Sequence, residues 1–223
     1  MITVHHLDNS RSQRVLWLLE ELRIPYDVKH YKRDKNMLAP PELKKLHPLG
    51  KAPIVETGDG QVIAETGAIM DYILNTYDGM GLVPGAKTRA RTHFTYWMFY
   101  AEGSAMTPLL LKLIVERIRA RSPWFAKPVA RKIADTIEDT LVRPNLTANI
   151  DFWDVTLAEG PWFAGELFTA ADIMMSFPVE AAAARAGAGA KPHIRAWLDR
   201  IHARPAYQRA LERGGPYDYA VRS

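Results

Sequence analysis

Apolar residues in the first third of the chain follow two periods, one typical of short strands and one of amphipathic helices. The helical period places Val15, Leu18, Leu19 and Leu22 on one face of a predicted helix. The predicted elements are a strand at 2–6, a helix at 10–23, strands at 26–31, 53–56 and 61–63, and a helix at 65–77. A β-α-β half followed by a β-β-α half predicts an α/β domain with a mixed sheet.

The pattern changes after a Gly- and Pro-bearing stretch at 78–85, beyond which we find only helical periods. Ile133, Ile137 and Leu141 are spaced by four, which is typical of a long helix. The predicted helices span 92–118, 130–157, 170–184, 192–202 and 205–213. Pro108 and Pro144 should kink the two long helices. We therefore expect an α/β N-terminal domain at 1–78, a linker at 79–86 and an all-α C-terminal helical bundle domain at 87–223.

Composition supports a globular protein and disfavours several partners. The 223 residues suit two unequal domains. Apolar runs stay well below the ~20 residues of a membrane helix, and residues 1–4 lead directly into strand-like sequence without signal-peptide features. The net charge of +4 comes from scattered basic residues with acidic neighbours. We expect a cytoplasmic protein that binds neither membranes nor nucleic acid.

The chain contains no cysteine, which excludes disulfides, a cysteine nucleophile and thiolate metal sites. Any thiol chemistry must therefore use a thiol that a ligand brings. The seven histidines show no HExxH or similar spacing, and this predicts that there is no metal site.

The loop before the first helix allows two interpretations. Ser10 and Gln13 have the spacing of a capping box, which is a purely structural role. A helix N-terminus also favours anions, and a free thiol has a pKa of about 8.5. Hydroxyl or amide donors at Ser10 and Asn9 would stabilise a bound thiolate there without acting as nucleophiles.

Two further segments could hold a peptide. If the Ala52–Pro53 bond is cis, the backbone of Ala52 could pair with an extended ligand, although trans is commoner for X-Pro bonds. Glu65 and Thr66 could cap the next helix, or they could bind the ammonium and carboxylate of one ligand. Together with the loop at Ser10, these segments describe a peptide-shaped site at a sheet edge.

Two segments of the helical region have mainly structural interpretations. Thr169 and Asp172 form a capping box pattern, and we interpret it as structural. Residues 96–106 are rich in aromatic residues and methionine, most of which should be core. Tyr100 and Met106 are the candidates to line a hydrophobic pocket that faces the first domain.

Four ordered segments, at 5–22, 47–53, 65–69 and 168–172, resemble the cytosolic glutathione transferases, and the similarity extends along essentially the whole chain. Residues 96–98 and 101–104 resemble a bacterial and fungal branch close to the theta-like and serine-type classes. The resemblance implies a thioredoxin-like N-terminal domain that binds glutathione as co-substrate. It also implies a homodimer and a small-molecule electrophile.

The resemblance also implies roles for particular residues. Pro53 should be cis, and Ala52 should hold the cysteinyl backbone of glutathione. Glu65 and Thr66 should bind the γ-glutamyl end, and Lys51 should approach the glycine carboxylate.

The residue that stabilises the thiolate departs from the family pattern. The usual serine position falls on Asn9, with Ser10 next to it and Ser12 two residues further. We expect Ser10 and Asn9 to act together, with Ser12 also at the glutathione site. The first strand region has no matching tyrosine, so the tyrosine-type mechanism is disfavoured.

The leading hypothesis is a glutathione transferase that activates glutathione for attack on a hydrophobic electrophile. The same thiolate could instead reduce peroxides or disulfides. A third alternative is a non-catalytic glutathione-binding or scaffolding protein, and the pairs Glu65–Thr66 and Ala52–Pro53 argue against it.

Overall fold

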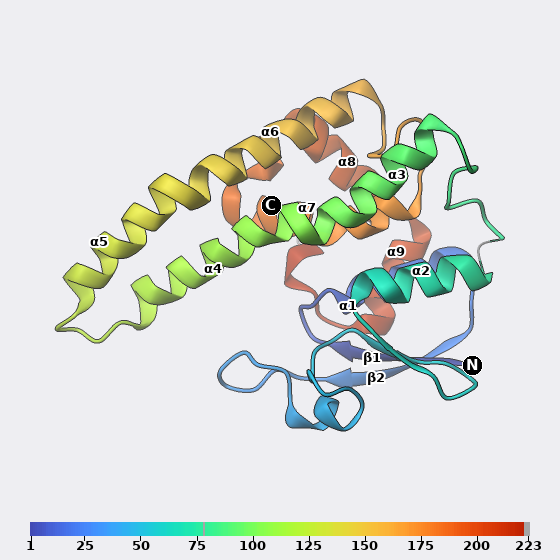
Figure 1. Ribbon diagram of the computed structural model, residues 1–223, viewed down its shortest axis with the longest axis horizontal. Coiled ribbons are helices and arrows are strands. Elements are labelled where there is room, and N and C mark those ends of the chain that lie inside the picture. Colours follow the sequence, from blue (N-terminus) through green and yellow to red (C-terminus); the bar gives the residue numbers. More distant parts are fainter. Residues whose placement is uncertain (78, 221–223) are drawn as a thin grey trace.

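A computed structural model describes residues 1–77 and 79–220, and in it a small sheet with two covering helices lies below a larger helical domain (Figure 1). Residue 78, at the predicted domain boundary, and residues 221–223 lie outside the described residues. The elements of the first domain are β1 (Ile2–Leu7), α1 (Ser12–Leu22), β2 (Tyr26–Tyr31), η1 (Pro41–Lys45), β3 (Ile54–Glu56), β4 (Val62–Ala64) and α2 (Thr66–Tyr77). The predicted α/β fold class is confirmed.

The sheet has the strand order β2-β1-β3-β4. β1 pairs in parallel with β2, whereas β3 is antiparallel to both β1 and β4. Val4 is central, since it lies opposite Val28 on one side and Val55 on the other. This topology brings the loop after β1 and the segment before β3 to neighbouring positions at one end of the sheet.

The second domain is helical throughout its described part. Its elements are α3 (Arg89–Tyr100), η2 (Ala101–Ala105), α4 (Met106–Arg121), α5 (Lys127–Ile137), η3 (Glu138–Val142), α6 (Arg143–Glu159), α7 (Ala170–Ala186), η4 (Ala188–Ala190), α8 (Pro192–His202), α9 (Pro205–Gly214) and η5 (Asp218–Ala220). Helix α7 is buried along most of its length, and α1 packs against both α7 and α9. The two domains therefore share one hydrophobic core.

The two long helices that the sequence predicts are each interrupted near the predicted proline. The interruptions are the π-helical turns η2 and η3, which precede Pro108 and Pro144 by a few residues. Proline donates no backbone hydrogen bond and crowds the preceding turn, so a locally wider turn relieves both problems. The helices predicted at 92–118 and 130–157 are therefore two helices each.

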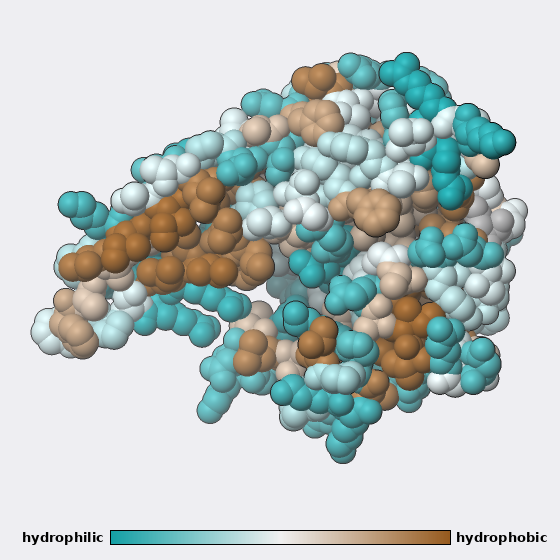
Figure 2. All heavy atoms as spheres, viewed as in Figure 1, coloured by the Kyte–Doolittle hydropathy of each residue, from teal (hydrophilic) through white to brown (hydrophobic). Residues whose placement is uncertain are grey.

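Helices α4 and α5 leave the body side by side as a long arm (Figure 1). Hydrophobic side chains gather along this arm (Figure 2). Its exposed apolar residues are Leu110, Ile114, Trp124, Phe125, Val129 and Ile133. By length and composition alone, the helical stretch Arg89–Arg121 could cross a membrane. The core helix of a soluble protein passes the same test, so this finding is weak evidence for a membrane span.

The predicted capping box at the start of α7 is confirmed. Thr169 Oγ1 accepts a hydrogen bond from the Ala171 N–H, and Asp172 Oδ2 accepts one from the Thr169 N–H at 3.0 Å. Both residues are buried.

We expect Thr169→Ala to lower the free energy of unfolding by about 1 kcal/mol, because the substitution removes the hydroxyl acceptor at the helix start. Urea unfolding followed by circular dichroism measures this effect. Thr169→Ser retains the acceptor and should keep most of the stability. An unfolding midpoint of Thr169→Ala equal to that of the wild type would refute the cap.

Candidate functional site

The predicted site residues surround a cleft between the sheet domain and helix α4, and Figure 2 shows the surface hollowed where the arm leaves the body. The cleft contains a pocket of about 390 Å³ and a narrower one of about 40 Å³. Asn9, Ser10 and Met106 line the larger pocket. Pro53, Glu65 and Thr66 line the narrower one. Arg11, Lys51 and Ala52 line both pockets, so the two are neighbours.

Ser10 lies at the loop that leads from β1 into α1. Its Oγ accepts a hydrogen bond from the Ser12 N–H at 3.2 Å and lies 2.7 Å from Ser12 Oγ. The predicted capping box with Gln13 is wrong: helix α1 begins at Ser12, and neither amide atom of Gln13 has a hydrogen-bond partner among the described residues. The physical reason is tertiary packing, since Gln13 is buried on the helix face that lies against α9.

Ser12 lies behind Ser10 and is fully buried. Its hydroxyl accepts from the Leu7 N–H at 3.2 Å and lies 2.9 Å from His6 Nδ1. Burial lowers the pKa of His6 to about 4, so this histidine is neutral at pH 7. Ser12 is absent from the described lining of both pockets, and its contacts orient the Ser10 hydroxyl instead.

Asn9 is held by the C-terminal segment. Its backbone has a φ of 50°, and its Nδ2 donates to Asp218 Oδ2 at 2.8 Å. The Asp218 N–H in turn donates to Asn9 Oδ1 at 2.8 Å. Sequence reasoning missed Asp218, because nothing local marks a residue 209 positions away as a neighbour.

Glu65 and Thr66 stand at the start of α2, beside the narrower pocket. Glu65 is exposed and has a φ of 71°, which is uncommon for a residue other than glycine. Thr66 is buried, and its Oγ1 accepts a hydrogen bond from Arg14 Nη2 at 3.4 Å.

Arg14 and Glu102 form an ion pair that sequence reasoning missed. Arg14 is fully buried and also donates to the backbone carbonyl of Met174 at 2.8 Å. Burial tends to raise the pKa of Glu102, but the cations of Arg14 and Arg11 outweigh it and hold that pKa below its ordinary value. Arg14 is four residues before Leu18, so helical spacing places this cation on the buried face of the helix. A cation there needs a partner, and this was the signal in the sequence for a buried ion pair.

The Ala52–Pro53 peptide bond is cis, as the resemblance implies. Pro53 is buried at the start of β3, and Lys51 is exposed at the junction of the two pockets. The three residues thus occupy the centre of the cleft.

The two candidates for the hydrophobic pocket lie in different places. Met106 lines the larger pocket, together with Leu109, Leu110 and Leu113 of the same helix. Tyr100 does not belong to its described lining: the Tyr100 hydroxyl donates to Asn149 Oδ1 at 2.6 Å and accepts from Trp153 Nε1 at 3.3 Å. Burial raises the pKa of Tyr100 to about 12, so its hydroxyl stays protonated within this contact to α6.

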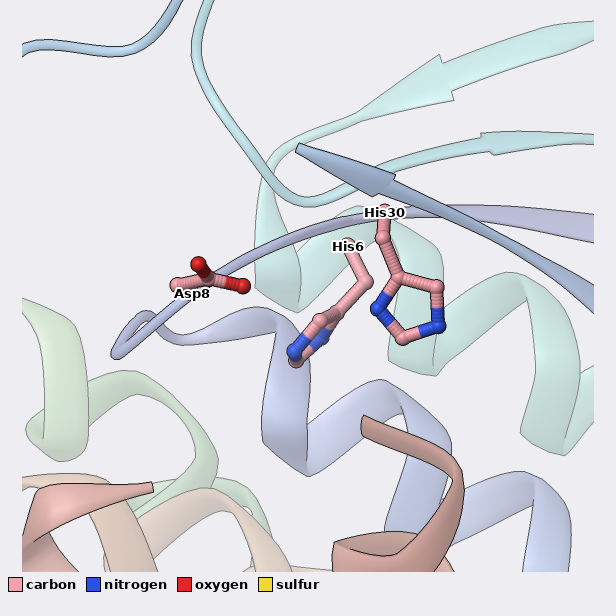
Figure 3. A group of neighbouring side chains, drawn as sticks. All are labelled: His6, Asp8 and His30. Carbon is pink, nitrogen blue, oxygen red and sulfur yellow. The ribbon is translucent and has the colours of Figure 1, made fainter. Parts of the chain in front are cut away.

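The fold gathers three potential metal ligands that the linear spacing does not reveal. His6 and His30 lie on neighbouring strands, and Asp8 follows in the loop after β1 (Figure 3). Their ligand atoms lie within 4.8 Å of one another. His6 Nδ1 lies 2.9 Å from the Ser12 hydroxyl, so this ring nitrogen already has a protein partner. The absence of a metal site stays a prediction.

A separate hollow of about 880 Å³, outside the cleft, lies between α3, the end of α6 and the segment before α7. Tyr96, Phe152 and Trp162 contribute to its lining, and none of the predicted site residues does. Size alone therefore does not identify the site.

Comparison with known proteins identifies the family of both parts of the chain. The glutathione S-transferase N-terminal domain model matches residues 1–75, and the glutathione S-transferase C-terminal domain model matches residues 129–205. A glutathione S-transferase crystal structure from Actinobacillus pleuropneumoniae superposes with a TM-score of 0.79 at 30% identity, covering 100% of this chain and 97% of that one. Fold and family matches thus define a chain with the N- and C-terminal domains of glutathione S-transferases.

Two curated relatives are similar over nearly the whole chain. Glutathione S-transferase 1 of Saccharomyces cerevisiae is 35% identical, with 96% of this chain and 95% of the relative covered. Glutathione S-transferase 3 of Schizosaccharomyces pombe is 37% identical, with 96% and 88% covered. The chain belongs to the glutathione S-transferase family, and it is a glutathione transferase.

Proposed function

We propose that glutathione lies extended across the cleft, with its γ-glutamyl end at Glu65 and Thr66 and its thiol at Ser10. The backbone of Ala52 pairs with the cysteinyl residue, and Lys51 lies near the glycine carboxylate. The observation that carries this proposal is the continuity of the two pockets, which share Lys51 and Ala52. Because of this continuity, one tripeptide can reach from α2 to the start of α1.

Ser10 is the proposed donor to the thiolate. Ser12 has one hydroxyl proton, and neutral His6 and the Leu7 carbonyl are both available to accept it. The Ser10 proton can then turn from Ser12 toward the sulfur, at the positive end of α1. Asn9 contributes second, because its amide is already paired with Asp218. The stabilised thiolate attacks a small electrophile, which is the chemistry of detoxification by conjugation.

The glutathione site is tested by Glu65→Gln. The substitution removes the charge that pairs with the glutathione ammonium, so the dissociation constant for glutathione should rise about 10- to 100-fold. Isothermal titration calorimetry measures this change. Glu42→Gln removes an exposed carboxylate outside both pockets and should leave binding unchanged. Equal affinity in the wild type and Glu65→Gln would contradict the assignment.

We further infer a cytoplasmic homodimer in which a second copy covers the exposed apolar residues toward the tip of the arm, Trp124, Phe125, Val129 and Ile133. Trp124 and Phe125 are 85% and 72% exposed, and residues of this kind seldom gather uncovered on a monomer. Neither a membrane nor a nucleic acid partner is expected. The domain division at 79–86 belongs to the same proposal.

A further inference from the structure

The larger pocket carries far more positive than negative charge. Its charged lining among the described residues consists of Arg11, Arg33, Lys51, Arg117, Arg185 and Asp218. Arg11 and Lys51 also line the narrower pocket, where the proposed glutathione carries its own carboxylates. Asp218 is paired with Asn9. The guanidinium groups of Arg33, Arg117 and Arg185 remain in the larger pocket.

None of these three arginines forms an ion pair with a carboxylate among the described residues, although the Asp8 carboxylate is close enough to Arg33 to raise the pKa of its guanidinium. Arg33 donates only to backbone carbonyls, those of Asp8, Asn9 and Met37, at 3.0–3.2 Å. Arg185 donates to the Tyr219 hydroxyl at 2.7 Å and lies 5.2 Å from the centre of that ring. Arg117 has no hydrogen bond or ion pair to any described residue. Elsewhere in the chain arginines do find carboxylates, as Arg14 finds Glu102 and Arg204 finds Glu21.

Two of these arginines, Arg33 and Arg117, are close enough to repel one another. Burial lowers the pKa of Arg33 and the Arg117 cation lowers it further, whereas Tyr219 and the Asp8 carboxylate act in the opposite direction. A cleft that gathers more cations than carboxylates attracts an ion of the opposite sign.

The wall opposite the loop at Ser10 is apolar. Leu109, Leu110 and Leu113 repeat along one side of α4, and Phe177 and Ala181 of α7 continue the surface. At about 390 Å³ the pocket is large enough for a small organic ligand. The pocket therefore combines an apolar wall with a cationic rim, which is formed by Arg33, Arg117 and Arg185.

We propose that the electrophilic co-substrate is an amphipathic carboxylate, with its apolar body against α4 and its anionic group between Arg117 and Arg185. The inference rests on the proposed glutathione site, because the thiolate at Ser10 supplies the nucleophile. Arg33 adds positive charge beside the anionic group. Its guanidinium also donates hydrogen bonds to the carbonyls of Asp8 and Asn9 and so holds the loop that carries Asn9.

The reaction of a suitable probe is simple. With 4-chloro-3-nitrobenzoate, the glutathione sulfur forms a bond to the carbon that bears chlorine, and chloride leaves with the electron pair of the C–Cl bond. The thiol proton passes to solvent. The carboxylate takes no part in bond making, so it reports on recognition alone.

The test compares three aryl chlorides that differ in charge: 4-chloro-3-nitrobenzoate, its methyl ester and 4-chloro-3-nitrobenzylamine. Each kcat/KM is divided by the uncatalysed rate constant with glutathione, which corrects for intrinsic reactivity. We expect the carboxylate to exceed the ester about fivefold and the ammonium compound by more, with the preference shrinking as salt rises.

Arg117→Gln is the main variant, because Arg117 holds no other described group in place. It should raise KM for the carboxylate about three- to tenfold and leave the ester within about twofold. Arg117→Glu should favour the ammonium compound. Arg185→Gln should act in the same direction as Arg117→Gln. Arg131→Gln on α5 removes an exposed cation outside the pocket and should change none of these ratios.

The outcomes separate this inference from the function it rests on. Equal normalised rates for the carboxylate and the ester, with glutathione bound and turned over, would overturn the inference and leave the transferase function intact. A rise in KM for glutathione with both electrophiles in Arg117→Gln would assign the arginine to glutathione and would also overturn it. Failure to bind glutathione at all would contradict the site proposed above.

Discussion

Replacing Asp172 by alanine is expected to lower the free energy of unfolding by about 4 kcal/mol, which is a large part of the ~5–15 kcal/mol typical of a native protein. Asp172 is completely buried, and its carboxylate accepts four hydrogen bonds from three parts of the helical domain. The donors are the N–H group of Phe163 at 3.0 Å, the N–H group and hydroxyl of Thr169 at 3.0 and 3.3 Å, and Trp197 Nε1 at 3.1 Å. Each buried donor left without an acceptor costs about 1–3 kcal/mol.

The comparison with Thr169→Ala shows what is specific to Asp172. Thr169 caps only α7, whereas Asp172 also fixes the segment at Phe163 and, through Trp197, helix α8. Chemical unfolding should therefore rank Asp172→Ala well below Thr169→Ala in stability. Asp199→Ala removes an exposed carboxylate from α8 and should stay within about 0.5 kcal/mol of the wild type. A loss for Asp172→Ala no larger than that for Thr169→Ala would contradict the three-way role.

The pH dependence of stability gives an independent check. Burial raises the pKa of Asp172 to about 6, from an ordinary value of 3.8, while its hydrogen bonds oppose the shift. A raised folded-state pKa means that the group's contribution to stability is fully present below about 4 and is lost as the pH rises through about 6. Asp172→Asn removes this titration. The difference in unfolding free energy between the wild type and Asp172→Asn should therefore shift in favour of the wild type as the pH falls from 7 to 4.

The site residues that could be predicted from the sequence are those next to a residue that marks the start of a strand or helix. Pro53 before a strand and Glu65 before a helix each mark the end of an element, and a β-α-β-β-α order brings such ends together at one edge of a sheet. The positions of Ser10 and Ala52 follow from the same order. A periodic pattern therefore places short motifs in space even when each motif alone is weak.

The rest of the site depends on contacts between distant segments. Asp218 reaches Asn9 from the far end of the chain, and Glu102 reaches Arg14 across the domain interface. Helical spacing shows that Tyr100 faces inward, but it does not show whether α6 or the cleft is its neighbour. Gln13 has the spacing of a capping residue, yet packing against α9 prevents that role. Local patterns specify a face, whereas tertiary packing selects its partner.

Ser10→Ala is expected to lower kcat/KM for conjugation of an aryl chloride about 100-fold, because it removes the donor proposed to stabilise the thiolate. The pKa of bound glutathione, followed by the ultraviolet absorbance of the thiolate, should rise by more than one unit, since one unit corresponds to ~1.4 kcal/mol. Affinity for glutathione should change little, because the tripeptide is held mainly by Glu65, Thr66 and Ala52.

Variants of the two neighbouring residues, Asn9 and Ser12, test whether Ser10 itself is the donor to the thiolate. Asn9→Ala should lower kcat/KM less than Ser10→Ala, because the Asn9 amide already has Asp218 as its partner. Ser12→Ala should have an intermediate effect, since it leaves the Ser10 hydroxyl in place but removes the contact that orients it. If Ser10→Ala and Asn9→Ala both leave kcat/KM and the thiol pKa unchanged, the thiolate is stabilised elsewhere, and the backbone N–H groups at the start of α1 become the remaining donors at this end of the cleft.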